Sequence, residues 1–117
     1  MATKVAPLFM LALFIGDASA IEFSGKTTAT SVVKQDILDT LLPLASAITQ
    51  CKAIESVQMS VETIPNNVKT NSNGIIISGG PIIERWVAKG CGTSVALKVK
   101  LTPVGKGGEA YSISTRQ

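Results

Sequence analysis

The chain has 117 residues, 45% of them hydrophobic, with eleven cations, eight anions and a formal net charge of +3. It contains no histidine, which excludes Ser-His-Asp and Cys-His catalytic arrangements and any histidine-based zinc site. Only five residues are aromatic, so the chain offers little surface on which nucleic-acid bases can stack, and no nucleic-acid partner is expected.

The first twenty residues have the three parts of a secretory signal peptide. Lys4 supplies a positive start, residues 5–16 are apolar, and the segment ends in Ala-Ser-Ala. The apolar run stops at Asp17, well short of the roughly 20 residues that a membrane-spanning helix needs. We therefore expect cleavage after Ala20, one small domain over residues 21–117 with no stable membrane anchor, and a periplasmic or secreted location.

Residues 31–51 have the periodicity of an amphipathic helix. Apolar residues recur there at intervals of three and four, which places them on one helix face; they are Val33, Ile37, Leu41, Leu44 and Ile48. Ser31 is a suitable N-cap, because its hydroxyl can accept a hydrogen bond from a first-turn amide. Pro43 removes a backbone donor and clashes with the preceding turn. The segment is predicted to form either one bent helix or two short helices that meet near Thr40 or Leu41.

Beyond Cys51 the apolar period changes to two, which is typical of strands with one buried and one wet face. The candidate strands contain residues 57–61, 81–89, 93–102 and 109–115. Asparagine and glycine residues predict turns within 65–80 and a hairpin loop over 105–108. Ile75–Ile77 is a candidate short strand, and residues 21–29 are a candidate additional strand at the N-terminal end.

These elements predict an α+β fold of two layers. The helix, intact or broken at Pro43, packs on one face of a four-stranded antiparallel meander sheet. The other face of the sheet carries polar side chains and is expected to meet water or a partner; these are Gln58, Glu62, Lys98, Lys100 and Ser112.

Cys51 and Cys91 are the only cysteines. In an oxidising compartment, two cysteines most simply form one disulfide, which stabilises a small domain by about 4 kcal/mol on the chain-entropy model. Redox chemistry usually needs a Cys-x-x-Cys pair, whereas these cysteines lie 40 positions apart. A structural disulfide is therefore predicted.

The segment ERWVAKGCG, residues 84–92, holds the single tryptophan, Trp86, next to Arg85. Strand alternation puts these two side chains on opposite faces. Packing in the core is the favoured interpretation for one tryptophan in a small domain; the alternative is that Arg85 and Trp86 form a contact pair for a ligand. Lys98 and Lys100, on the wet face of the clearest strand, complete the candidate binding residues.

The carboxy-terminal half resembles a group of small exported bacterial domains of uncharacterised function. The resemblance rests on Glu84-x-Trp86, then Cys91-Gly92, then an alternating strand, and then Gly107-Gly108 before an aromatic-containing strand. It implies a bacterial periplasmic or secreted protein in which Cys91 is paired, with no assigned activity.

No motif for catalysis, metal binding or a cofactor is found. Apart from Asp17, the acidic residues, Glu84 and Glu109 among them, form no pair at a spacing typical of glycosidases and are expected at the hydrated surface. The glycine pairs fit neither phosphate-binding motif. A hydrolase that uses these carboxylates is the weakest hypothesis.

We therefore expect an exported, non-enzymatic module that binds a macromolecule, with a protein as the expected partner. The open face of the sheet or the loop over residues 65–80 is the predicted contact surface. The alternative is an inhibitor of a secreted or host hydrolase, by analogy with cystatin-like folds in which a helix lies on a sheet.

Overall fold

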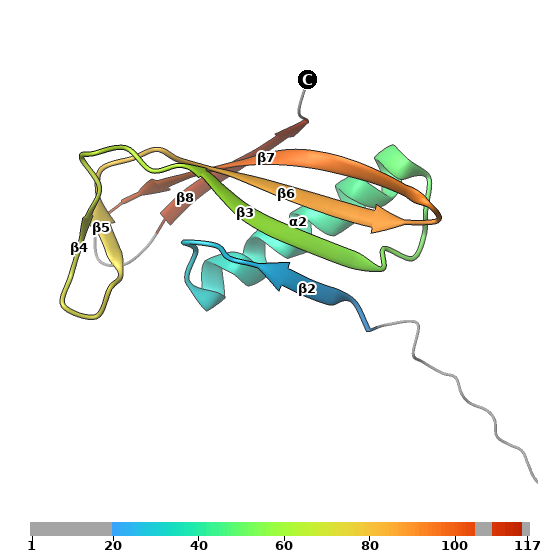
Figure 1. Ribbon diagram of the computed structural model, residues 1–117, viewed down its shortest axis with the longest axis horizontal. Helices are drawn as coiled ribbons and strands as arrows, with labels where there is room; N and C mark the ends of the chain where they lie inside the picture. Colours follow the sequence, from blue (N-terminus) through green and yellow to red (C-terminus); the bar gives the residue numbers. More distant parts are fainter. Residues whose placement is uncertain (1–19, 105–108, 116–117) are drawn as a thin grey trace, which may run out of the picture.

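The computed structural model describes residues 20–104 and 109–115 (Figure 1). The predicted signal peptide, except for Ala20, and the predicted loop at 105–108 lie outside the described residues. The elements in chain order are β2 (Glu22–Gly25), α2 (Ser31–Thr49), β3 (Ser56–Thr63), β4 (Lys69–Thr70), β5 (Ile76–Ser78), β6 (Ile82–Gly90), β7 (Thr93–Pro103) and β8 (Glu109–Thr115). Among the described residues, no helix has the length and apolarity needed to cross a membrane.

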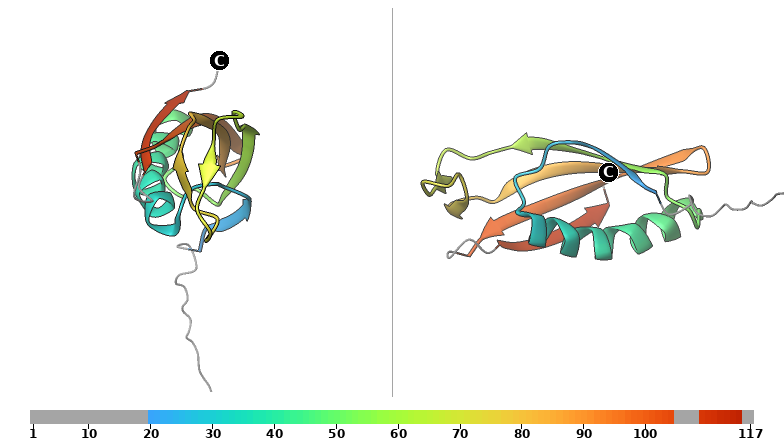
Figure 2. Two further views of the ribbon diagram at one scale, coloured as in Figure 1. Left: turned by 90° about the vertical axis from the view of Figure 1, so that its left-hand side faces the viewer. Right: turned by 90° about the horizontal axis from the view of Figure 1, so that it is seen from below.

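The main sheet has five strands in the order β2-β3-β6-β7-β8, and α2 packs on one of its faces (Figure 2). This confirms the α+β class. The prediction of a four-stranded antiparallel meander is wrong in part: β3, β6, β7 and β8 form that meander, but β2 adds a fifth strand parallel to β3. The parallel pairing arises because α2 carries the chain back between β2 and β3, as a crossover helix does.

A single helix spans Ser31–Thr49 and continues through Pro43, so the alternative of two short helices is wrong. Pro43 is exposed, and the carbonyl that its missing N–H leaves unpaired can accept from water. Thr30, rather than the predicted Ser31, is the N-cap: its backbone is extended, and its side chain accepts a hydrogen bond from the Val33 amide at 3.4 Å.

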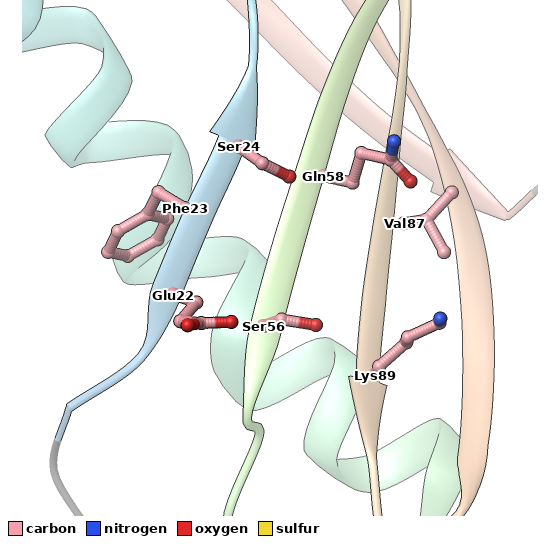
Figure 3. A pocket seen from close by; sticks show the side chains of 7 residues that line it. All are labelled: Glu22, Phe23, Ser24, Ser56, Gln58, Val87 and Lys89. Atoms are coloured by element: carbon pink, nitrogen blue, oxygen red, sulfur yellow. The ribbon is translucent and has the colours of Figure 1, made fainter.

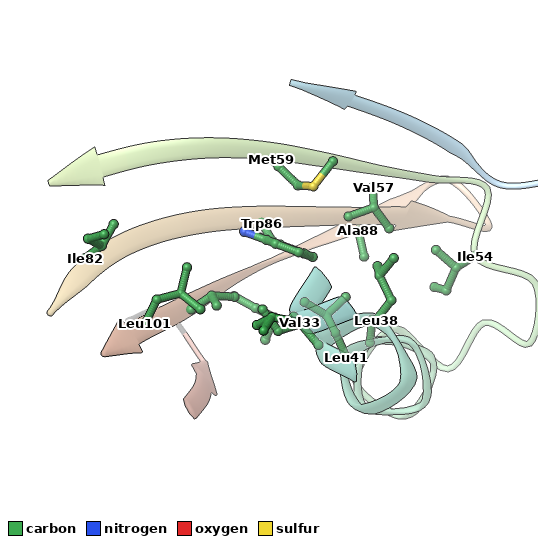
Figure 4. Close-up of a cluster of buried hydrophobic side chains, with 14 residues drawn as sticks. Val33, Leu38, Leu41, Ile54, Val57, Met59, Ile82, Trp86, Ala88 and Leu101 are labelled. Atoms are coloured by element: carbon green, nitrogen blue, oxygen red, sulfur yellow. The ribbon is translucent and has the colours of Figure 1, made fainter. Parts of the chain in front are cut away.

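The core lies between α2 and the inner face of the sheet (Figure 4). The helix buries Val33, Ile37, Leu38, Leu41 and Ala45. The predicted stripe is therefore wrong at its end, since Leu44 is half-buried and Ile48 is 42% exposed. The sheet twists beneath the helix, so the buried side of α2 rotates from the Val33 side at its start to the Ala45 side near its end.

The predicted disulfide joins Cys51 to Cys91, with the two Cα atoms 5.7 Å apart. It connects the segment after α2 to the turn between β6 and β7. The preceding residue, Gly90, has no room for a side chain: a Cβ there would lie 2.8 Å from the carbonyl oxygen of Ala53 and 2.9 Å from Sγ of Cys51. The glycine therefore lets the strand end pack directly on the disulfide.

Residues 65–80 form an arm that extends beyond the main sheet, and within it β4 and β5 pair as a separate two-stranded sheet (Figure 1). The predicted short strand at Ile75–Ile77 is found as β5. Asn71 stabilises the turn at the tip of the arm, because its Oδ1 accepts hydrogen bonds from the backbone amides of Asn73 at 2.9 Å and Ile75 at 3.0 Å. At the base of the arm, Oδ1 of Asn67 accepts from the Gly80 amide at 3.1 Å.

Leu41→Ala tests the packing of the helix on the sheet. Leu41 is fully buried in one cluster with Leu97 and Val99, so the substitution should lower the free energy of unfolding by about 2–5 kcal/mol through lost burial and the cavity left behind. Asp39 is exposed, and its carboxylate accepts a hydrogen bond from the exposed side chain of Gln35, so Asp39→Ala should change the free energy of unfolding by less than about 0.5 kcal/mol. Urea unfolding followed by circular dichroism measures both; equally small effects would show that α2 does not cover the sheet.

Candidate interaction surface

The alternation of β6 decides which of the candidate residues are available to a partner. Trp86 faces α2 and is fully buried, whereas Arg85 faces away and is exposed. The two side chains therefore do not form a joint contact pair for a ligand. Trp86 lies in the core, which agrees with the favoured interpretation of the sequence. In the described part of the chain the face of the sheet away from α2, here called the outer face, is open (Figure 2).

Four cations lie on the outer face, on two adjacent strands. Arg85 and Lys89 belong to β6, and Lys98 and Lys100 belong to β7. Lys98 is half-buried and the others are exposed. Arg85 and Lys98 are direct partners in the strand ladder, an arrangement of like charges that destabilises a sheet. The pairing concentrates positive charge at the middle of the outer face.

Each of the four cations has a serine directly opposite it on a neighbouring strand. On β3, Ser60 is opposite Arg85 and Ser56 is opposite Lys89. On β8, Ser114 is opposite Lys98 and Ser112 is opposite Lys100. The Ser60 hydroxyl donates to the Arg85 carbonyl at 3.2 Å, and the cations with the other three hydroxyls supply donors that suit carboxylate groups. Of these residues, Ser112 was predicted on the open face with Lys98 and Lys100, whereas Lys89, Ser56, Ser60 and Ser114 were not, because only the strand register brings them together.

A depression of about 450 Å³ adjoins the cations at the β2 side of the outer face (Figure 3). It is lined by side chains of β2, β3 and β6: Glu22, Phe23, Ser24, Ser56, Gln58, Val87 and Lys89. The Phe23 ring points away from the other lining side chains (Figure 3), and Nζ of Lys34 on α2 lies 5.5 Å from its centre. Five of the seven lining residues have polar side chains, so the depression extends the hydrogen-bonding surface of the outer face.

Glu84 was expected at the hydrated surface, but its side chain is fully buried. Its Oε1 accepts from the Trp86 indole at 2.8 Å and from the Thr27 hydroxyl at 2.7 Å. Its Oε2 accepts from the amide and the hydroxyl of Thr28 at 2.8 and 2.6 Å. Four donors satisfy this buried carboxylate, which is therefore a structural link between β6 and the segment before α2. No sequence signal marks it, since alternation puts Glu84 on the Trp86 side without showing its donors.

Glu109 is a second inward-facing carboxylate, near the start of α2. It is half-buried, and no donor among the described residues meets full hydrogen-bond geometry with its shielded oxygens, so the backbone N–H of Thr30 acts on this carboxylate only as a weaker attraction. Burial raises the pKa of Glu109, the negative charge of Glu84 raises it further, and the backbone amide of Thr30 partly offsets the rise. Because Glu84 is enclosed by its donors, the two carboxylates do not form an accessible acid-base pair.

Comparison of the chain with protein-family models, curated proteins and solved structures found no match. Residues 20–104 and 109–115 contain no group of three or more cysteine or acidic side chains placed to hold a metal ion. The outer face, with its four cations and their serine neighbours, is therefore the candidate functional site.

Glu84→Gln tests the link between β6 and the segment before α2. In the variant, an amide nitrogen replaces one carboxylate oxygen and cannot accept a hydrogen bond. The donors that bonded to that oxygen lose their acceptor, and each hydrogen bond lost should lower the free energy of unfolding by about 1–3 kcal/mol. Glu55 has an exposed side chain, so Glu55→Gln is the matched control and should cost less than about 0.5 kcal/mol. Urea unfolding measures both; equal effects would mean that the Glu84 hydrogen bonds do not stabilise the fold.

Glu109→Gln tests the effect of the raised pKa on stability. The folded protein holds the Glu109 proton more tightly than the unfolded chain, so the stability that this group contributes is present below its ordinary pKa of 4.5 and is lost as the pH rises through the folded value. Glutamine has no proton to lose. The free energy of unfolding of the variant, relative to that of the native protein, should therefore increase as the pH rises from acidic to neutral. Urea unfolding at each pH measures this difference. A difference that does not change with pH would contradict the prediction.

Proposed function

We propose that this protein is an exported, non-enzymatic module that binds an acidic surface of another protein through the outer face of its sheet. The observation that carries the proposal is the set of four cations on β6 and β7, each opposite a serine. Complementary charge of this kind guides association and selects partners of the opposite sign.

Export to the periplasm or the extracellular medium is part of the proposal. It is supported by the signal-peptide pattern of the first twenty residues and is compatible with the Cys51–Cys91 disulfide, since disulfides persist in oxidising compartments. A non-enzymatic role is supported by the absence of histidine from the sequence and by the complete enclosure of the Glu84 carboxylate.

The arm supports a second candidate function, inhibition of a secreted or host hydrolase. An inhibitor needs a projecting, rigid element that enters an active-site cleft, and residues 65–80 project beyond the sheet with side-chain hydrogen bonds at tip and base. The two candidates differ in the surface that they use. Substitutions at the tip, Asn71–Gly74, should abolish inhibition and leave binding at the outer face unchanged.

Charge neutralisation tests the outer face, with poly-L-glutamate as a defined acidic polypeptide. The native protein should bind it in a salt-dependent manner. Arg85→Gln combined with Lys98→Gln and Lys100→Gln should weaken binding roughly 3- to 150-fold, because each exposed ion pair contributes about 0.2–1 kcal/mol. Titration calorimetry measures the affinity.

The control removes three cations that are exposed and lie on other elements, by Lys26→Gln, Lys52→Gln and Lys69→Gln. Both triple variants lose three positive charges, so net charge is matched. The control should bind as the native protein does. Equal loss in the two variants would show that net charge, rather than the outer face, controls binding, and no binding by the native protein would contradict the proposal directly.

A further inference from the structure

β8 is an edge strand without the usual protection. Among the described residues it pairs only with β7, in continuous register. Residues 110–114 (AYSIS) contain no charge and no proline, whereas natural sheets normally protect a long edge with lysine, proline, a bulge or a covering segment. The backbone groups of residues 110–114 that point away from β7 are therefore able to pair with another strand.

The opposite edge of the same sheet is short. β2 has only four residues, carries Glu22 and is followed by Lys26. It ends at Gly25, which has a φ of +86° and lies so close to β3 that an added Cβ would be 1.8 Å from the Met59 carbonyl oxygen. β2 therefore offers a shorter edge of four residues, whereas β8 offers seven, with its charge confined to Glu109 at the start of the strand.

Apolar side chains flank the open edge on the inner side of the sheet. The Tyr111 hydroxyl donates to the Asp36 carbonyl at 3.1 Å and lies 3.4 Å from the Thr40 hydroxyl, which shows that the Asp36–Thr40 side of α2 faces β8. Leu44 and Ile48 follow on that side at four-residue spacing. Leu44 is half-buried and Ile48 is 42% exposed, and the inward side chains of β8 beside them, Tyr111 and Ile113, are half-buried.

We infer that β8 pairs antiparallel with β8 of a second copy of this chain, about a two-fold axis at Ser112. In this register Tyr111 lies opposite the partner subunit's Ile113 on the inner side, an aromatic and β-branched pair that stabilises antiparallel strands. On the outer side Ala110 lies opposite the partner subunit's Ser114, and the two Ser112 residues face each other. No two like charges meet within residues 110–114, so the strand is complementary to itself, as an isologous interface requires.

This pairing goes beyond the proposed function and does not depend on it. It also brings the two outer faces into one surface, because Lys98 and Lys100 on β7 lie next to β8 in each copy. An acidic partner that contacts both copies at once would bind more tightly than one that contacts a single copy, because the second contact forms within the same complex.

Sedimentation velocity tests the pairing through charges placed at its centre. The native protein should dimerise between micromolar and millimolar concentration. Ser112 is exposed, so Ser112→Lys and Ser112→Glu should fold normally by circular dichroism but place like charges opposite each other, weakening the dimer by about tenfold or more. An equimolar mixture of the two variants should regain dimerisation, because opposite charges then meet.

Gln58→Lys and Gln58→Glu are the matched controls, since Gln58 is exposed on the outer face of β3, away from the β8 edge. Both should dimerise as the native protein does. A native protein that stays monomeric throughout the range, Ser112 variants that dimerise normally, or a mixture of the two Ser112 variants that stays monomeric would each overturn the inference.

Discussion

The buried carboxylate of Glu84 is the constraint on which the arrangement of this domain depends. A carboxylate without partners in this position would be strongly unfavourable, so the chain must bring donors to it. Thr27 and Thr28 supply three of the four hydrogen bonds. They lie just before the N-cap of α2, so the requirement to satisfy Glu84 also determines where the helix begins over the sheet. The contact of Tyr111 with the first turns of α2 follows from that placement.

The two ends of α2 are held by different kinds of interaction. Hydrogen bonds to Glu84 hold the segment before its first turn, and the Cys51–Cys91 disulfide holds the segment after its last turn. Between these points the helix contributes mainly apolar burial. This division explains why Pro43 is tolerated on the exposed side, since neither the hydrogen bonds nor the buried side chains require its missing N–H.

Much of the fold could be predicted from local patterns, because burial alternates as the sequence does along β3, β6 and β7. The helix, the disulfide and the opposite orientations of Arg85 and Trp86 follow from periodicity and composition. The burial of Glu84 could not be predicted, because three of its four hydrogen bonds come from Thr27 and Thr28, more than fifty positions away. The pairing of each outer-face cation with a serine could not be predicted either, since it depends on register between strands, and the parallel direction of β2 depends on the path of α2.

Trp86 is the single tryptophan of the chain, its side chain is fully buried, and its indole N–H is bonded to Glu84. The tryptophan fluorescence of the protein therefore comes from one indole, buried in the domain and hydrogen-bonded to Glu84. Any opening of the segment before α2 would admit water to this indole and shift its emission to longer wavelength, even where the strands stay paired. The protein thus carries its own optical probe for local opening at the Glu84 link, separate from loss of the sheet.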